Sequence, residues 1–412
     1  MIQEFINKHF YNLYIISLIF AIVTYGLIDF KSIDELCVVA LFLLCTFYVF
    51  HTKDWNVNKI SLYIFSVFLF YLLYSFYIHS NSKKAIIVDF IIQLKPYIAF
   101  FCAYHLRPHF SDSQKKLLRE ISIVCWYLLL PFGLISIFYP DMLYIVANHP
   151  SNYAAAITAI ALTFLLSSSF SKKDKILFII MLAVGLFSGR SKFYGFFVFS
   201  AFVTFFFSNA QNIKLNFKNV VILLLMLIAI GIVAKSKIEY YFLQNLSLDT
   251  DLNEAKNSIA RFVLYATSWE IFQDYMPFGS GFATFGTHAS AAYYSPLYKE
   301  YGIDTVWGLS KSYPYFISDT YYPSLAQFGV VGVILFAVFW LYLCLKAYKN
   351  FRQTNNAQFV TIIIIITGYF AIENIADATF TSNRGYFFML LLGLIFSEMK
   401  QFQHSLTSKE KQ

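Results

Sequence analysis

Apolar runs long enough to cross a lipid bilayer recur along most of the sequence, and they constrain its fold more than any other feature. A membrane-spanning helix needs about 20 mostly apolar residues. Because lipid cannot satisfy unpaired backbone groups, and because the runs are continuous rather than alternating, each is predicted to be a helix and not a barrel strand. We identify twelve candidates, at about 11–29, 34–50, 60–79, 85–104, 118–139, 153–170, 175–189, 193–208, 219–235, 325–345, 359–378 and 384–399.

Composition supports this reading and excludes the main alternatives. Hydrophobic residues make up 58% of the 412 residues and charged residues only 13%, whereas soluble domains carry roughly a quarter charged residues. Mean hydropathy is +0.60, so too few polar side chains exist to cover a water-exposed surface. We therefore exclude a soluble enzyme, a nucleic-acid binder and a disordered chain. The predicted fold class is all-α, a polytopic integral membrane protein with about 12 transmembrane helices and one large external loop.

The distribution of basic residues predicts the orientation in the membrane. If the N-terminus is cytoplasmic, the inside segments hold eighteen Lys and Arg and the short outside loops hold six. Basic residues concentrate in cytoplasmic loops, so both termini are predicted to be cytoplasmic. The net charge of +8 follows from this rule and does not indicate a nucleic-acid partner. The expected partner is membrane lipid.

One segment interrupts the pattern of short loops. Residues 236–324 separate the ninth and tenth predicted spans, on the outside, and are rich in aromatic residues. Loops this long are usually functional or disordered, and this aromatic composition is not typical of disorder. We divide the chain into helices 1–9 (1–235), a periplasmic loop (236–324) and helices 10–12 with a cytoplasmic tail (325–412). Within the loop, 258–276 has the spacing of an amphipathic helix capped by Asn257 or Ser258, which could lie on the membrane face.

Several motifs are missing from the sequence. No Gly-Lys-Ser/Thr phosphate-binding loop and no His-Glu-x-x-His pair occur, so neither nucleotide nor zinc chemistry is predicted. The cysteines lie in apolar runs without metal-ligand spacing and are expected to be buried and unpaired. We predict no metal and no cofactor. An energy-rich lipid pyrophosphate donor fits a group transfer that uses neither.

Three charged residues at the outer ends of helices are candidates for catalysis. Arg190, in Ser188-Gly189-Arg190, and Arg261, on the predicted loop helix, offer planar guanidinium groups that bind phosphate oxygens in pairs. Each is alternatively an ordinary interfacial or solvated Arg. Asp319 lies just before the tenth span, where a general base could meet an external substrate. Its alternative role is the N-cap of that helix.

A second group is predicted to bind substrate. Glu373 and Asp377 are four residues apart, on one face of a predicted helix, and Arg384 follows. Ionisable residues in spans are usually functional, although these three could also neutralise one another as a structural cluster. His149 and Asn152 lie at the outer mouth of the sixth span, where they also read as a turn and cap.

Taken in order, these segments resemble the O-antigen polymerase and O-antigen ligase superfamily. In the ligase branch a His and a polar residue precede nine residues, Gly, two residues and Gly. Here Gly329 and Gly332 keep this spacing, whereas Ser318 and Asp319 occupy the first two positions, so the missing His favours the polymerase branch. The segments that carry the resemblance are the turn Asn148-His149-Pro150-Ser151-Asn152, the turn Ser188-Gly189-Arg190, and the loop pattern Arg261 to Trp269 followed by Pro277-Phe278-Gly279-Ser280-Gly281.

The resemblance implies a metal-independent glycosyltransferase of the bacterial inner membrane, multi-pass, that acts at the periplasmic face. It would polymerise undecaprenyl-pyrophosphate-linked oligosaccharide units into O-antigen or capsular polysaccharide, with Asp319, Arg190 and Arg261 as catalytic residues. Expected protein partners are a chain-length regulator and a flippase. Two alternatives remain: an O-antigen ligase that transfers polysaccharide to lipid A-core, and a flippase for lipid-linked oligosaccharide.

Overall fold

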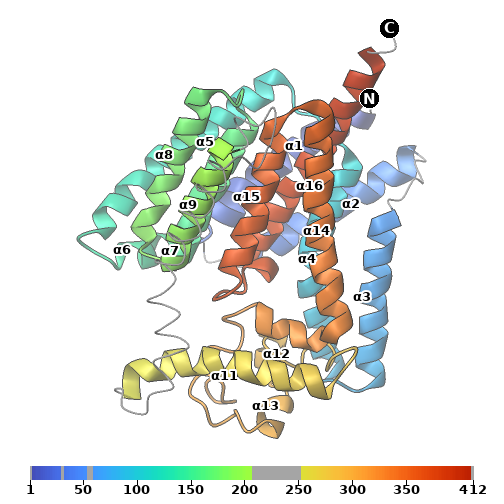
Figure 1. Cartoon of the computed structure of the whole chain (residues 1–412), viewed down its shortest axis with the longest axis vertical. Coiled ribbons are helices and arrows are strands. Elements are labelled where there is room, and N and C mark those ends of the chain that lie inside the picture. The colour runs from blue at the N-terminus through green and yellow to red at the C-terminus, as the bar shows by residue number, and fades with distance from the viewer. Residues whose placement is uncertain (1, 29–31, 53–58, 207–251, 410–412) are drawn as a thin grey trace, which may run out of the picture.

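The computed structural model describes residues 2–28, 32–52, 59–206 and 252–409, and these form a helical bundle (Figure 1). The N-terminal helices are α1 (Ile2–Ile16, continued by η1, Ser17–Val23), α2 (Ile33–Thr52), α3 (Lys59–Tyr77), α4 (Lys83–Leu106), α5 (Asp112–Ser136) and α6 (Met142–Ala147). The middle helices are α7 (Pro150–Leu166), α8 (Lys172–Ala183, continued by η2, Val184–Ser188), α9 (Ser191–Phe206) and α11 (Leu252–Asp274). The remaining helices are α12 (His288–Ala292), α13 (Leu297–Glu300), η6 (Tyr322–Phe328), α14 (Gly329–Thr354), α15 (Ala357–Glu373), η7 (Thr379–Thr381) and α16 (Asn383–Lys409).

Every predicted span that falls within the described residues coincides with a helix; the predicted span 219–235 lies outside them. In the described part of the chain, six helices are long and apolar enough to cross a membrane: Ile2–Val23, Ile33–Thr52, Lys59–Tyr77, Lys83–Leu106, Asp112–Ser136 and Tyr322–Thr354. Three shorter apolar helices are Pro150–Leu166, Ser191–Phe206 and Ala357–Glu373. The all-helical prediction is confirmed for the described residues, and the total of twelve spans stays a prediction.

The helices divide into central and peripheral ones by burial. On α16, all residues from Tyr386 to Leu392 are fully buried, and α7 is buried along nearly its whole length. By contrast, α3 and α14 leave most of their apolar side chains at least partly exposed. A helix that is apolar on all sides belongs either in a core or against lipid, and this bundle contains both kinds.

The long loop forms a layer across one end of the bundle. Figure 1 shows α11 lying crosswise to the bundle helices, with α12 and α13 on the same side, while the beginning of α1 and the end of α16 lie at the opposite end. The layer has its own apolar core, which includes Leu264 and Ile271 of α11, Phe285, Tyr298 and Ile317. The beginning of α1 and the end of α16 therefore lie at the same end of the bundle. The assignment of both termini to the cytoplasm stays a prediction.

The loop layer is bonded to the bundle through backbone groups. The carboxylate of Asp89, buried in α4, accepts from the Ala283 N–H at 2.7 Å. The hydroxyl of Ser75 in α3 accepts from the Phe282 N–H at 2.8 Å. The side chain of Gln327 in η6 accepts from the Thr284 N–H at 2.8 Å. Since buried backbone groups need partners, these polar side chains inside apolar helices fix where the loop sits.

Two glycines make the closest approach between the loop and α14. Gly279 and Gly329 both have positive φ, 79° and 56°. A Cβ built on Gly279 would lie 2.3 Å from the Gly329 nitrogen, and one on Gly329 would lie 2.4 Å from the Gly279 nitrogen. Only glycine combines that conformation with that proximity. The Gly residues in the motif therefore join the loop to the start of α14.

The predicted loop helix is present, but its predicted start is wrong. The helix α11 begins at Leu252, so neither Asn257 nor Ser258 is its cap. Ala260, Leu264 and Ile271 pack into the loop core. The predicted aromatic face is turned away from that core, with Trp269 61% exposed. Placement of that face on a membrane surface stays a prediction.

Candidate functional site

The two loop residues expected to act separately form an ion pair. Arg261 of α11 donates from Nε to Asp319 Oδ2 at 2.7 Å and from a second nitrogen to the same oxygen. Both side chains keep partial access to solvent, at 22% and 32% exposure. The alternative reading of Asp319 as an N-cap is wrong, because the next helix, η6, is preceded by Tyr321 and lacks a side-chain cap. The pair lies where the loop meets the bundle.

Arg190 contacts His149 across two helix starts. The 3-10 turn η2 ends at Ser188, and Gly189 takes a positive φ of 65° before α9 begins at Ser191. A guanidinium nitrogen of Arg190 donates to His149 Nε2. The other ring nitrogen of His149 faces the Ser151 N–H at 3.3 Å and caps α7. The reading of this segment as a turn and cap is confirmed, with His149 as the capping residue, and the Arg190 guanidinium points to His149.

Lys192 bridges the two predicted carboxylates. Its ammonium lies 2.6 Å from Glu373 Oε2 and 3.4 Å from Asp377 Oδ2. The prediction that both carboxylates share one helix face is wrong: α15 ends at Glu373, and Asp377 lies in the following turn. The side chain of Asn374 accepts from the Phe380 N–H at 3.0 Å and turns the chain there. The two carboxylates are therefore brought together by their shared contact with Lys192 and not by helical spacing.

Arg384 completes this group with a two-pronged contact. Its guanidinium donates to both oxygens of Asp377, at 2.9 and 2.6 Å. Such paired contacts are the strong ion-pair geometry of arginine. The three predicted residues Glu373, Asp377 and Arg384 therefore do meet, with Lys192 as the member that sequence reasoning missed. Lys192 was visible in the sequence as a second cation two residues after Arg190.

These three groups of contacts lie within electrostatic range of one another, and we call them together the charge cluster. Its eight members come from the α7 start, the α9 start, α11, the end of the long loop, and the α15–α16 connection. They comprise four cations and three carboxylates, a formal net charge of +1 with His149 neutral. The members are His149, Arg190, Lys192, Arg261, Asp319, Glu373, Asp377 and Arg384.

Mutual electrostatics tune the charge cluster. Burial, reinforced by the positive charge of Arg190, lowers the pKa of His149 to about 4, so the ring is neutral at pH 7. Burial also raises the pKa of Asp319 above its usual range, although the charge of Arg261 opposes the shift. The charge of Asp377 raises this pKa further, and the charge of Lys192 lowers it. At Asp377 burial is outweighed by Arg384 and Lys192, so its pKa is lowered. The three groups thus have different proton affinities within one site.

Asn152 is not brought into the charge cluster by any contact that we describe. Its amide nitrogen donates to the Ala147 carbonyl at 3.0 Å and holds the turn before α7. Its predicted substrate role therefore has no geometric support beyond its position beside His149. Among the described residues, no group of three or more His, Cys, Asp or Glu side chains is arranged to hold a metal ion.

A polar cavity of about 310 Å³ adjoins the charge cluster. Ser318, Ala378 and Ser382 line it, next in sequence to Asp319 and Asp377 and two residues before Arg384. Its far wall is formed by the N-terminal helices, with Asp34 and Glu35 of α2 and Lys95 of α4. Lys95 lies 2.5 Å from Asp34 and 3.2 Å from Glu35. Sequence analysis did not pair them, although a Lys inside a span calls for a counter-ion.

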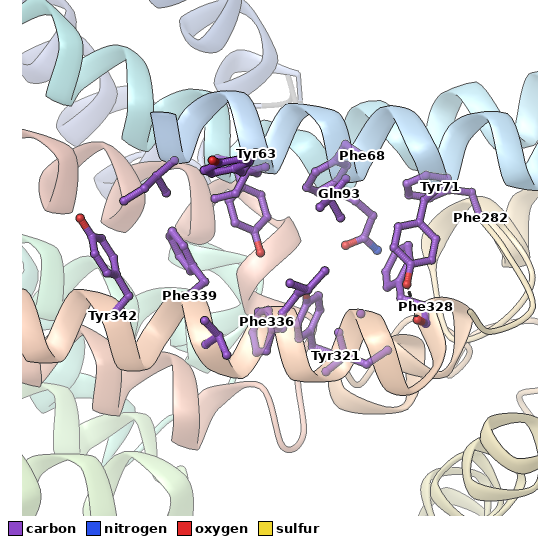
Figure 2. A pocket seen from close by; sticks show the side chains of 18 residues that line it. Tyr63, Phe68, Tyr71, Gln93, Phe282, Tyr321, Phe328, Phe336, Phe339 and Tyr342 are labelled. Atoms are coloured by element: carbon purple, nitrogen blue, oxygen red, sulfur yellow. Dashed lines mark hydrogen bonds between the residues drawn. The ribbon is translucent and has the colours of Figure 1, made fainter. Parts of the chain in front are cut away.

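An apolar groove of about 270 Å³ runs between α3 and α14 and meets the polar cavity. Figure 2 shows Tyr63 and Phe68 on one side facing Phe336 and Phe339 on the other, with the amide of Gln93 directed between them. Gln93 and Tyr321 line both the groove and the polar cavity. An apolar groove between two membrane-length helices is thus continuous with a polar compartment beside the charge cluster.

A comparison with models of known protein families finds a match in the central part of the chain. Residues 176–337 match the family model described as O-antigen ligase. This match covers less than half of the chain and supports a relation to the O-antigen ligase/polymerase superfamily. The matched segment contains Arg190, Lys192, Arg261 and Asp319, whereas α2, α4 and α15 lie outside it. A search of curated proteins found no match to the chain.

This match supports a ligase- or polymerase-type function, and it applies equally to both branches. It implies lipid-linked oligosaccharide substrates and a membrane lipid environment. Together with the apolar helices, it indicates a protein of a bacterial inner membrane.

Proposed function

We propose that this chain polymerises undecaprenyl-pyrophosphate-linked oligosaccharide units into O-antigen or capsular polysaccharide at the periplasmic face. The observation that carries the proposal is the Arg261–Asp319 ion pair, at the junction of loop and bundle and inside the matched superfamily segment. It places a phosphate-binding group against a candidate base. A sugar transfer from a lipid pyrophosphate requires both.

The charge cluster is suited to hold the pyrophosphate. With four cations and three carboxylates it has a net positive charge, and Arg261 keeps partial solvent access. Guanidinium groups bind phosphate oxygens in pairs. We assign Arg190 and Arg261 to the pyrophosphate. Lys192 and Arg384 neutralise Glu373 and Asp377, which hold the wall of the site.

Asp319 is the proposed base, and its contact with Arg261 links base strength to substrate binding. In the structure the carboxylate is paired and its pKa is raised by burial. When the pyrophosphate takes the guanidinium, Asp319 loses part of its stabilising cation and becomes a stronger base. The acceptor hydroxyl is thereby deprotonated only when the donor is present.

The reaction balances with these groups alone. The acceptor hydroxyl oxygen forms a bond to C1 of the donor sugar, and the bond from C1 to the pyrophosphate oxygen breaks. The electron pair leaves with the lipid pyrophosphate, whose added negative charge Arg190 and Arg261 stabilise. The hydroxyl proton passes to Asp319. The carboxylates of the cluster are paired with side-chain cations, which supports a metal-independent transfer.

The apolar groove is the proposed position of the lipid chain. It is lined by aromatic and aliphatic side chains of α3 and α14, and it shares Gln93 and Tyr321 with the polar cavity beside the charge cluster. An isoprenoid chain lying in the groove would have its pyrophosphate near the loop end of the bundle. The proximal isoprene units fit this volume.

The polymerase assignment is tested in a strain that lacks this chain. A polymerase defect leaves single units on the lipid and on the cell surface. A ligase defect instead leaves long polymer on the lipid and none on lipid A-core. The Ser318-Asp319 pair in place of the ligase His supports the first outcome, and accumulation of long lipid-linked polymer would contradict it.

The flippase alternative is tested by the loop. Shortening 236–324 while preserving the spans should abolish polymer, because Arg261 and Asp319 are removed from the charge cluster. A transporter should tolerate the change better. Transport of lipid-linked units across vesicles by the shortened protein would favour the flippase.

A further inference from the structure

The polar cavity has features of a ligand site that the pyrophosphate chemistry does not use. It is lined by side chains from both ends of the chain and from the loop, including Asp34, Lys95, Thr287 and Asn383. Its volume of about 310 Å³ is at the lower end of the roughly 300–1,000 Å³ of small-molecule sites. Lys95 and Asp34 are more than nine-tenths buried and still border it.

Glu35 offers a carboxylate oxygen on the cavity wall. This residue accepts from Lys95 through Oε1 at 3.2 Å, and its side chain, 46% exposed, also interacts with Asp34. Its other oxygen, Oε2, is enclosed. A hydroxyl of a ligand in the cavity could donate to this carboxylate.

The charge of the cavity differs from that of its neighbour. Lys95 with Asp34 and Glu35 has a formal charge of −1, opposite to the charge cluster at +1. Tyr25 connects the two regions, since it lines the cavity and lies within electrostatic range of Asp34, Glu35 and Arg384. A phosphate is therefore repelled from the cavity and attracted to the cluster. Hydroxyl donors are attracted to the cavity.

We propose that this polar cavity binds the sugar ring attached to the pyrophosphate, and that it selects neutral or amino sugars over acidic ones. The inference rests on the proposed function, since that sugar is one bond from the phosphate. Hydroxyls of the ring donate to Glu35 and Asp34, and Gln93 and Asn383 line the same cavity. The selecting residues lie in α2 and α4, outside the matched superfamily segment.

The test compares how well two lipids protect one engineered cysteine from chemical labelling. Thr381, on the cavity wall, is changed to Cys (T381C) in the full-length protein in nanodiscs. Labelling by a charged methanethiosulfonate reagent is followed with undecaprenyl pyrophosphate or with the undecaprenyl-pyrophosphate-linked repeat unit from a strain lacking this chain. Tyr315→Cys, at a side chain that is 71% exposed, is the matched control. The parent protein measures the background from its own cysteines.

The glycosylated lipid should slow the labelling of T381C at least tenfold, whereas the unglycosylated lipid should slow it less than twofold. Neither lipid should change the labelling rate of Tyr315→Cys. Equal protection by both lipids would place the pyrophosphate in the cavity and overturn the proposal. Binding of both lipids without protection by either would place the sugar elsewhere, also overturning it. Failure of the parent protein to bind either lipid would instead remove the proposed function on which the inference rests.

If T381C does not fold, Thr287→Cys on the opposite wall repeats the measurement. A repeat unit whose first sugar is a uronic acid should protect either thiol at least tenfold less well than its neutral counterpart. Equal protection by the acidic sugar would contradict the selectivity.

Discussion

The charge cluster and the polar cavity lie next to each other and are both built from carboxylates and cations, but their net charges have opposite signs. In the cluster, cations outnumber carboxylates by four to three, and its central pair remains partly exposed. In the cavity, two carboxylates surround one lysine that is 5% exposed. Four of the eight cluster members lie in the matched segment, whereas the cavity carboxylates and lysine come from α2 and α4 outside it. Under the two proposals, sugar selection therefore depends on helices that the family model does not cover.

The largest effect is expected when the cluster loses a guanidinium. Arg261→Ala and Arg190→Ala should each abolish polymer while the protein stays in the membrane, because removing one preorganised charge contact typically costs about 10²–10³ in rate. Substitution by Lys should restore activity only in part, since a point charge lacks the planar fork. Polymer length on gels and membrane immunoblots measure both outcomes. Normal chains from Arg261→Ala would remove the loop helix from the site.

A matched pair of lysine variants should separate the two regions. Breaking a buried ion pair costs about 3–5 kcal/mol, so Lys192→Met and Lys95→Met should both lower the melting temperature in detergent. Only Lys192→Met should also lose the stabilisation by added undecaprenyl pyrophosphate, because the net charge of the cluster falls from +1 to zero.

Lys192→Arg, which keeps the cation, serves as the folding control for this comparison. Loss of lipid pyrophosphate stabilisation in Lys95→Met alone would reverse the assignment of the two regions.

The pH dependence should separate the base from its neighbours. Activity should rise with pH as Asp319 loses its proton, and this acid limb should lie above the ordinary aspartate range because burial raises the pKa of Asp319. Burial and the charge of Arg190 instead lower the pKa of His149, to about 4, so the two groups shift in opposite directions. Rate profiles of His149→Gln should therefore keep the limb. Its disappearance in that variant would make His149 the base.

The smallest effect is expected from metal removal. The carboxylates of the cluster are engaged by Lys192, Arg261 and Arg384, so purified protein should keep its rate in excess EDTA. Loss of activity that Mg²⁺ or Mn²⁺ restores would reveal a carboxylate site of a different kind.

Sequence reasoning predicted the helices well because lipid permits few alternatives. Apolar runs located every span that the structure describes, and the glycines of the motif proved to join loop and bundle. Long-range pairing was much harder to predict. Arg261 and Asp319 are 58 positions apart, and only the docking of the loop onto Asp89, Ser75 and Gln327 brings them together.

The remaining errors have local causes. Helical spacing predicted that Asp377 lies on α15. The chain instead turns at Asn374, and the Asp377 carboxylate in that turn contacts Lys192. The pairing of Lys95 with Asp34 depends on the packing of α2 against α4, which periodicity does not encode. Residues that require a partner can be recognised in a sequence, whereas the identity of the partner requires the fold.

Asp319→Asn in purified protein, supplied with the lipid-linked repeat unit, tests the central claim most directly. Asn preserves the size of the side chain and one acceptor oxygen but accepts no proton, and a positioned base contributes about 10²–10⁴-fold. The account predicts a folded protein that still binds the lipid, elongates it at least a hundredfold more slowly, and leaves single units on the lipid in cells. Near-normal chain length from Asp319→Asn would contradict the role of the Arg261–Asp319 pair in catalysis.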